Sequence, residues 1–354
     1  MRCGSIRRSI GKSNDGIAAG PMSKLKKLSK FLPILGIALF LWILKGLGRE
    51  GMMNILSILK NANLPLFISA AAFGFFVMLI KAWKWQLIVH SVKLKFSLWE
   101  SYIAWLIGFG ASIVTPGRVG DFYRVVYVRR ANNKASLGVC LSTVFFDRLI
   151  DIFIMVMFAG LGILYLIFNY QIPSAVKYLV FAGVLGGLLF VFLFRENVVS
   201  IFLRPMFNIF IPDRHKENVR KNFKVFFTLL RQMLSDRPRL AKILVVSIIG
   251  WMLSFVQTFV FAVCLGIDVS YPFIMAITPI INMVEIVPIS FSGIGTRDAV
   301  LIYFFSLVSL SSSAAVSYSF MILSFSYLSA MIGLLLWWRY PMAAASSNKK
   351  GIIV

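Results

Sequence analysis

The sequence "SGIGTRD", residues 292–298, interrupts a long apolar stretch with glycines and an adjacent arginine and aspartate. Glu285 lies a few residues before it, and the run from Ala299 to Leu310 that follows carries no charge. A second stretch, "TPGRVGD" at 115–121, repeats this combination in the other half of the chain. Irregular backbone and ionisable side chains persist at membrane depth only where they are buried in protein or line a watery cavity. We therefore predict that both stretches break membrane helices inside a bundle.

The composition agrees with a membrane protein. Hydrophobic residues make up 59 % of the 354 residues and charged residues only 14 %, whereas soluble domains carry about 25 % charge. This predicts an all-α, polytopic membrane helix bundle. The net charge of +24 is concentrated between apolar spans, which favours loops facing an anionic leaflet over nucleic-acid binding. The three cysteines and two histidines show no metal-ligand spacing, so we expect no metal and no cofactor.

Hydropathy predicts six full crossings, at 31–44, 64–80, 137–168, 178–194, 243–265 and 313–338. The segments 97–134 and 271–311 are predicted to enter the membrane and return to the same side as re-entrant or broken hairpins. Counting a hairpin arm as a crossing gives seven or eight spans. The predicted division is a basic N-terminal tail (1–30), a transmembrane domain (31–340) and a short C-terminal tail (341–354).

The positions of the basic residues predict the orientation. With both termini in the cytoplasm, most of the 37 Lys and Arg residues fall on the cytoplasmic side, as the positive-inside rule requires. We therefore expect a multi-pass protein of the cell (cytoplasmic or inner) membrane. The linker 195–242 is basic and carries apolar residues at helical spacing. It predicts an amphipathic helix that lies either on the membrane surface or against the protein's own cytoplasmic face.

An internal repeat relates the two halves. Residues 64–116 align with 236–288 at an offset of 172, which places Pro116 opposite Pro288. After five additional residues, Asp121 falls opposite Asp298. Because 64–80 runs inward and 243–265 runs outward in the predicted topology, the halves 64–168 and 236–340 form an inverted repeat, as in many secondary transporters. The alternative is chance similarity between apolar segments.

The two broken stretches supply the candidate binding residues, and each contains an Asp or Thr able to cap a helix that begins beside an Arg. A helix N-terminus offers free N–H groups and partial positive charge to an anion, and arginine adds a fork that matches phosphate. We predict Arg118 and Arg297 as phosphate-binding residues, one in each repeat. Their neighbours complete the predicted substrate site, the glycines by letting a head group approach the backbone: Gly117, Gly120, Asp121, Arg124, Gly293, Gly295, Thr296 and Asp298. In the alternative, Arg297 pairs with Asp298 or Glu285, and Arg118 pairs with Asp121, and these pairs only neutralise charge.

The stretch "FFDRLID" in the span 137–168 supplies a third group of charges. Asp147 and Asp151 share a helix face, and Arg148 reaches Asp151. We predict a gate, a proton relay or a counter-charge for the arginines, with a solvated pair near the helix end as the alternative. Glu285 is added to this gating or counter-charge group. The stretch "KAWKWQ" at 81–86 is interpreted as an interface anchor, with Trp83 and Trp85 beside lysines.

Three motifs, "TPGRVGDFYRVVYVRR", "FFDRLIDI" and "PISFSGIGTRDAVL", together resemble the lysylphosphatidylglycerol synthase transmembrane-region family, also described as flippase-like membrane proteins. Family members more often carry Glu at the positions of Asp121, Asp147 and Asp298. The resemblance implies a bundle that moves or accommodates lipids with charged head groups. Bifunctional members carry a soluble aminoacyl-transferase domain after the bundle. Since this chain ends shortly after its last span, we do not extend synthase activity to it.

The leading hypothesis is a lipid translocator, without enzyme activity, for anionic membrane lipids or polyprenyl-linked lipids. No GxxxxGK[ST] loop is present, so ATP drive within this chain is not expected. A second hypothesis is a non-catalytic membrane protein partner of a lipid or glycolipid synthesis enzyme. A third is an intramembrane enzyme that acts on lipid-linked phosphates through Asp147, Asp151, Glu285 or Asp298.

Overall fold

The computed structural model describes residues 21–132, 135–170, 213–286 and 293–340, together with 174, 178, 181–183, 185–186 and 290. Within these residues every regular element is a helix. Four helices are long and apolar enough to cross a membrane: α2 (Leu64–Ser91), α5 (Leu137–Asn169), α9 (Arg237–Cys264) and α12 (Ser312–Arg339). They coincide with four of the six predicted crossings, so the prediction of an all-helical, multi-pass bundle is confirmed for the described part of the chain.

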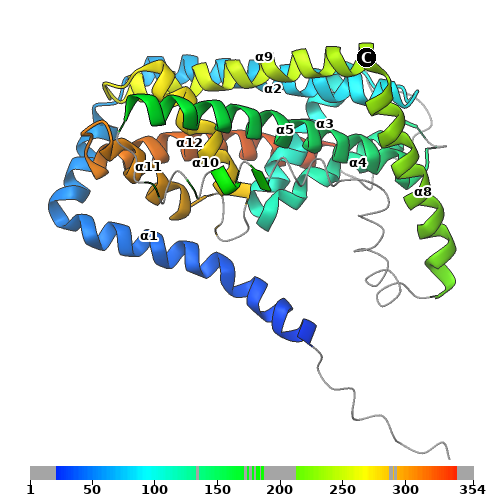
Figure 1. Cartoon of the computed structure of the whole chain (residues 1–354), viewed down its shortest axis with the longest axis horizontal. Helices are drawn as coiled ribbons and strands as arrows, with labels where there is room; N and C mark the ends of the chain where they lie inside the picture. The colour runs from blue at the N-terminus through cyan, green and yellow to red at the C-terminus, as the bar shows by residue number, and fades with distance from the viewer. Residues whose placement is uncertain are drawn as a thin grey trace, which may run out of the picture.

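The other two predicted crossings have different outcomes. The span 31–44 falls inside α1 (Pro21–Lys60), which Gly48 interrupts with a φ of 64°. This value lies in the left-handed region that only glycine adopts readily. In Figure 1, α1 leaves one end of the bundle and its N-terminal part points away from the other helices. Most of the span 178–194, the first part of the linker (195–212) and the tail 341–354 lie outside the described residues.

Polar side chains fix where the long helices begin. The Asn63 carboxamide accepts the Leu66 N–H at the start of α2, and Ser136 and Ser311 do the same for α5 and α12. Such caps satisfy N–H groups that have no partner within the helix and stabilise its first turn. Asp236 caps α9, which therefore begins at Arg237, before the predicted start of that crossing at 243.

Helices α2 and α9 lie side by side and run antiparallel along one face of the bundle (Figure 1). The start of α2 meets the end of α9, where the Asn63 N–H donates to the Cys264 carbonyl oxygen at 2.8 Å. Further along, the Gln257 side chain donates to the Ala70 carbonyl oxygen. Near the end of α2, the Lys81 ammonium lies 4.2 Å from the centre of the Trp251 ring. The two helices thus contact each other over most of their length.

Two further antiparallel pairs cross between the halves of the sequence. Helix α3 (Leu98–Val114) packs against α12, and α10 (Tyr271–Ile286) packs against α5. Both crossings depend on a glycine. A Cβ atom on Gly333 would lie 2.2 Å from the Leu106 carbonyl oxygen, and one on Gly162 would lie 2.3 Å from the Ala276 carbonyl oxygen. The backbones are therefore closer than any side chain would permit, as is common where membrane helices pack.

This closeness gives a testable prediction. Gly333→Ala is expected to push α12 from α3 and to lower the free energy of unfolding by about 1–3 kcal/mol. Gly46→Ala is the matched control, because a Cβ atom there meets nothing within 4 Å. Thermal unfolding of the detergent-purified protein measures both. A Gly333→Ala variant as stable as the control would show that the crossing tolerates separation.

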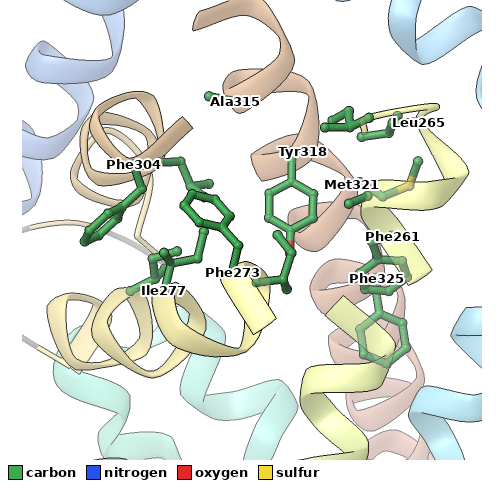
Figure 2. Close-up of a cluster of buried hydrophobic side chains, with 14 of the residues drawn as sticks. Phe261, Leu265, Phe273, Ile277, Phe304, Ala315, Tyr318, Met321 and Phe325 are labelled. Carbon is green, nitrogen blue, oxygen red and sulfur yellow. The ribbon is translucent and has the colours of Figure 1, made fainter. Parts of the chain in front are cut away.

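The largest apolar cluster takes in residues of α2, α3 and α5 as well as of the second half, and aromatic side chains fill the part of it where α9, α10, α11 (Thr296–Ser306) and α12 meet (Figure 2). The Phe261 and Phe325 ring centroids are 5.7 Å apart, and those of Phe305 and Tyr318 are 5.5 Å apart. The buried Tyr318 hydroxyl donates to the Thr258 carbonyl oxygen. This satisfied phenol and the ring contacts hold the second half of the bundle together.

The helix α8 (Asp213–Ser235) answers the question about the linker. Its apolar side is buried against α2, α5 and α9 through Phe227, Leu230 and Met233. The Phe226 ring also contacts Phe145 on α5 at 5.3 Å between centroids. From residue 224 on, where its side chains are described, α8 therefore packs on the protein itself rather than using this face to bind the membrane surface.

Candidate functional site

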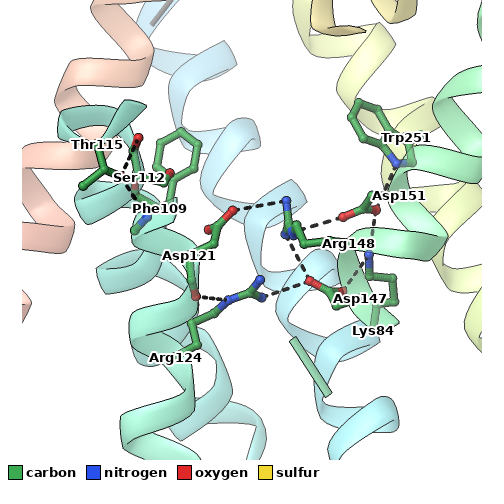
Figure 3. Close-up of polar contacts among 11 residues, drawn as sticks. Lys84, Phe109, Ser112, Thr115, Asp121, Arg124, Asp147, Arg148, Asp151 and Trp251 are labelled. Carbon is green, nitrogen blue, oxygen red and sulfur yellow. Dashed lines mark hydrogen bonds and ion pairs between the residues drawn. The ribbon is translucent and has the colours of Figure 1, made fainter. Parts of the chain in front are cut away.

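A cluster of charged side chains lies inside the first half of the bundle (Figure 3). It joins the short helix η1 (Pro116–Tyr123) and α4 (Arg124–Ala131) to α2 and α5. We call it the charge network. Its members are three cations and three carboxylates linked by ion pairs: Lys84, Asp121, Arg124, Asp147, Arg148 and Asp151. Among the described side chains, the network therefore contains as many positive as negative charges.

Asp147 is the centre of the charge network. Its carboxylate is completely buried and lies 2.8 Å from the Lys84 ammonium, 3.0 Å from the Arg124 guanidinium and 3.0 Å from the Arg148 guanidinium. Arg124 is also completely buried; its guanidinium lies 4.9 Å from the centre of the Trp85 ring. Charges this far from water are tolerated only when ion pairs and hydrogen bonds satisfy them.

Arg148 is the most exposed member of the charge network. Its side chain is 28 % exposed, whereas the other five are at most 10 % exposed. The guanidinium contacts carboxylate oxygens of Asp121 at 3.3 Å, Asp147 at 3.0 Å and Asp151 at 3.5 Å. One arginine thus connects the broken segment η1 to the long helix α5.

Asp151 connects the charge network to α2 and α9. Its carboxylate lies 2.6 Å from the Lys84 ammonium and accepts the Trp251 indole N–H at 3.2 Å. Asp147 and Asp151 are four residues apart, so both point from the same face of α5. Lys84 reaches both of them from α2.

The sequence of the first broken stretch explains how Asp121 and Arg124 reach α5. Thr115 ends α3, and its hydroxyl accepts the Gly120 N–H at 2.8 Å. A Cβ atom on Gly120 would lie 2.2 Å from the Ala111 carbonyl carbon, so η1 folds directly back onto α3. Gly108 leaves room for the Arg124 side chain, because a Cβ atom on Gly108 would lie 2.8 Å from the Arg124 Cγ atom. The space beside Gly120 is thus filled by the protein's own backbone, which corrects the expectation that this glycine admits a head group.

The second broken stretch forms a separate cluster in the other half of the bundle. The Arg297 guanidinium contacts the Glu285 carboxylate at 3.2 Å and donates from Nε to the Ser319 hydroxyl at 2.8 Å. The residue is 2 % exposed. Its Nη2 atom is buried and has no hydrogen-bond partner in the described part of the chain. This arginine therefore keeps an unused donor inside the bundle.

Glycine geometry and a carboxylate shape the start of α11. Gly293 and Gly295 have φ values of 78° and 84°, which glycine adopts without strain. The Asp298 carboxylate accepts the Gly295 N–H at 2.7 Å. The Thr296 hydroxyl contacts the Ser290 hydroxyl at 2.7 Å. Asp298 thus caps a helix, as the sequence predicts for an acid at this position, and Arg297 pairs with Glu285.

In three places the structure differs from what the sequence led us to expect. Arg124, predicted as part of the substrate site, is completely buried in the charge network and pairs with Asp147. Asp121 pairs with Arg148 from α5. Trp85 and Lys84, interpreted as interface residues, are completely buried or nearly so. The surroundings of Gly117 and the side chain of Arg118 lie outside the described residues, so the phosphate-binding role of Arg118 stays a prediction.

Sequence reasoning missed Lys84, Trp251 and Ser319 as members of these clusters. Counting the charges of the first half could have identified Lys84. The first half places Asp121, Asp147 and Asp151 near one membrane-embedded arginine, Arg148, so additional buried cations were required. Ser319 and Trp251 carry no comparable signal, because a serine or tryptophan in an apolar helix is ordinary. Among the described residues, no group of three or more His, Cys, Asp or Glu side chains is arranged to hold a metal ion.

The fold and these clusters define a multi-pass helical membrane protein with two buried, ion-paired arginine sites. The family model for the lysylphosphatidylglycerol synthase TM region matches residues 30–333, and the chain belongs to this family.

Three relatives that the chain resembles are described as UPF0104 membrane proteins. A UPF0104 membrane protein of Methanothermobacter thermautotrophicus is 22 % identical over 77 % of this chain and 85 % of its own length. One from Pyrococcus horikoshii is 22 % identical over 81 % of this chain and 89 % of its own length. One from Methanocaldococcus jannaschii is 24 % identical over 62 % of this chain and 88 % of its own length. These names describe membrane proteins and assign no activity.

Proposed function

We propose that this protein is a lipid translocator, without catalytic turnover, for lipids with anionic or phosphate head groups. The head group would cross between the halves of the bundle while the acyl or prenyl tails stay in the bilayer. The single observation that carries the proposal is the charge network, buried in a membrane bundle and reaching the surface mainly through Arg148. Ionisable groups at such depth are expensive, so they usually serve a substrate or ion pathway.

The chemistry of Arg148 supports a transient partner. Its guanidinium shares three carboxylates, and its contact distances to Asp121 and Asp151 are long for charge-assisted hydrogen bonds. A phosphate diester presents the same pair of anionic oxygens as a carboxylate, and arginine binds both through two parallel N–H groups. A head group can therefore replace Asp121 at Arg148 without leaving the guanidinium unpaired.

The helix packing supports the inverted repeat that such a pathway requires. The α2–α9 pair is antiparallel and joins the two halves. Helix α3 of the first half packs on α12 of the second, and α10 of the second packs on α5 of the first. The peripheral helices also pack on the opposite half of the chain: α1 packs on α12, and α8 packs on α5. An inverted repeat with a two-fold axis in the membrane plane, as in many secondary transporters, would produce this same exchange of partners.

Exposed basic residues support a cytoplasmic location for one end of the bundle. The helices α4 and α8 lie at the same end (Figure 1). Exposed Arg and Lys side chains occur on or beside them: Lys93, Lys95, Arg129, Lys224, Arg231 and Arg237. Under the positive-inside rule this end faces the cytoplasm. The charge network lies toward it, because Lys84 is near the end of α2 and Arg124 begins α4. We place head-group access at the inner leaflet, with Arg297 as a second, deeper station.

Reconstitution into vesicles tests the proposal. Fluorescent phosphatidylglycerol in the outer leaflet is bleached by an impermeant reductant, and further bleaching reports exchange between the leaflets. Wild-type protein is expected to accelerate this exchange over protein-free vesicles. Arg148→Ala removes the accessible guanidinium, and Arg118→Ala removes the sequence-predicted one; each is expected to lower the rate about tenfold or more.

Arg239→Ala is the matched control for these two variants. Arg239 is 59 % exposed and pairs with Asp236 on the surface at 3.3 Å, a kind of pair worth under about 1 kcal/mol. Its removal is expected to leave the exchange rate unchanged. Turnover of the lipid by the wild-type protein would favour an intramembrane enzyme. Absence of both exchange and turnover would favour a partner of a lipid synthesis enzyme.

A further inference from the structure

Backbone contacts fix the two helices that carry the partners of Arg297. Glu285 lies on α10 and Ser319 lies on α12. Helix α12 meets α3 so closely that a Cβ atom on Gly110 would lie 2.8 Å from the Ala330 carbonyl oxygen. Helix α10 meets α5 through the equally close contact described above. Because separating either helix from the first half would break such a contact, neither is suited to the movement that would admit a lipid to Arg297.

Helix α1 also packs on α11 and α12, and it contains a break. At the break, Gly48 adopts a φ of 64° and a ψ of −171°, a backbone conformation essentially confined to glycine. A Cβ atom on Gly48 would meet nothing within 4 Å, so close packing does not explain the glycine. A residue that takes up a change of φ and ψ between two rigid segments can act as a hinge.

Polar contacts anchor the part of α1 that follows the break. The Ser313 hydroxyl on α12 donates to the Gly51 carbonyl oxygen at 3.3 Å. Just beyond the end of α1, the Asn63 N–H donates to the Cys264 carbonyl oxygen of α9 at 2.8 Å. These hydrogen bonds make the residues after Gly48 the fixed side of the break.

Apolar side chains hold the part of α1 before the break, residues 39–47. The Phe40 ring centroid lies 5.9 Å from that of Phe320 on α12, and Ile43 is buried in the same region. Trp42 is 71 % exposed, as expected for a face turned to lipid. Lipid tails are as apolar as these side chains, so helix packing in a membrane lacks the hydrophobic driving force that acts in water. Lipid tails can therefore replace residues 39–47 against α12 at little cost.

This part of α1 lies beside the Arg297 cluster. Its apolar contacts take in Ala299 of α11 and Phe320 of α12. Ala299 comes two residues after Arg297, and Phe320 directly follows Ser319, whose hydroxyl accepts the Arg297 Nε–H at 2.8 Å. The same turns of α11 and α12 thus carry both the arginine site and the contacts with α1.

From these contacts we infer that residues 39–47 form a lateral gate, hinged at Gly48, beside the Arg297 cluster. When the gate swings away from α12, lipid tails take its place against α11 and α12, and the head group reaches Arg297. The inference rests on the proposed function and adds the moving part that this function requires. The backbone contacts between the two halves of the described bundle stay in place during exchange.

Cross-linking the gate to α12 tests the inference. Phe40→Cys with Phe320→Cys is made in a background in which Cys3, Cys140 and Cys264 are replaced by alanine. The shortest bismaleimide joins the two thiols through thioether bonds, which the bleaching reductant does not cleave. Each sample is measured before and after linking, so the effects of the substitutions themselves cancel. Linking is expected to lower phosphatidylglycerol exchange in vesicles about tenfold or more.

Phe75→Cys with Phe325→Cys is the matched control. The centroids of these two rings are 5.8 Å apart, and the pair joins α12 to α2, two helices that the inference holds fixed. Linking this pair is expected to leave the exchange rate unchanged. Equal exchange by the linked and unlinked Phe40–Phe320 samples would overturn the inference. Loss of exchange in the linked control would also overturn it, because the movement would then include the bundle itself.

A second measurement tests the hinge without any lipid transport. Gly48→Ala and Gly46→Ala each place a methyl group in open space, but within α1 Gly48 is non-helical and Gly46 is helical. Gly48→Ala is expected to slow the linking of the Phe40–Phe320 cysteine pair about tenfold, and Gly46→Ala is expected to have no effect. Equal linking rates would overturn the hinge. Absence of exchange by the wild-type protein would instead reject the proposed function.

Discussion

Asp147→Asn is expected to lower the free energy of unfolding by about 3–5 kcal/mol, the usual effect of breaking a buried ion pair from one side. The substitution keeps the shape of the side chain and removes only its charge. Lys84 and Arg148 keep Asp151 as a partner. Arg124, completely buried, loses the one carboxylate it contacts in the described part of the chain. The measurement is chemical or thermal unfolding of the protein in detergent.

A second substitution separates charge from packing. Arg124→Met removes the stranded cation and leaves an apolar side chain of similar length against Trp85. Asp147→Asn with Arg124→Met is therefore expected to be more stable than Asp147→Asn alone, with a coupling energy of about 1–3 kcal/mol. If Asp147→Asn unfolds at the wild-type temperature, the carboxylate is not the centre of the network. If the double variant shows no recovery, the damage comes from packing.

Arg297→Gln is expected to lower lipid exchange about tenfold to a hundredfold in reconstituted vesicles. The buried Nη2 atom of Arg297 has no hydrogen-bond partner among the described residues, and a charge-assisted hydrogen bond to phosphate contributes about 1.5–3 kcal/mol. A factor of ten in rate corresponds to about 1.4 kcal/mol. The loss is expected in the reductant assay at matched protein content.

Stability is the competing explanation, because Arg297→Gln also removes the ion pair that Arg297 makes with the Glu285 carboxylate at 3.2 Å. The companion variant Arg297→Gln with Glu285→Gln removes both charges of the pair. It is expected to recover most of the lost stability and none of the lost exchange. Recovery of exchange together with stability would mean that Arg297 only neutralises Glu285 and does not bind a head group.

The sequence predicted much of the local structure around the site. The placement of Asp147, Arg148 and Asp151 in one helix and the Arg148–Asp151 contact are confirmed. The capping role of an acid at "GTRD" is also confirmed, by the hydrogen bond from Gly295 to Asp298. Both are local: spacing along one helix and the chemistry of its first turn determine them. The pairing of Arg297 with Glu285 was among the alternatives that short-range reasoning left open.

Contacts between distant segments were beyond local reasoning. Lys84 meets Asp151 across 67 residues, and its surroundings in "KAWKWQ" read as a membrane interface. Whether a lysine at the end of an apolar span faces head groups or another helix depends on how that helix is rotated. That rotation follows from packing against α5 and α9, which no window of the sequence contains.

The sequence by itself determined that this chain is a helical membrane protein with ionisable residues at two broken segments, because hydropathy, charge spacing and helix-breaking residues act locally. The tertiary structure alone decided the partners of those residues. It closed Lys84, Arg124 and Asp121 into the charge network and filled the space beside Gly120 with the protein's own backbone. The physical reason is that a buried charge is stabilised by whichever opposite charge the packing brings within about 4 Å. That distance is set by how whole helices cross and not by their order in the chain.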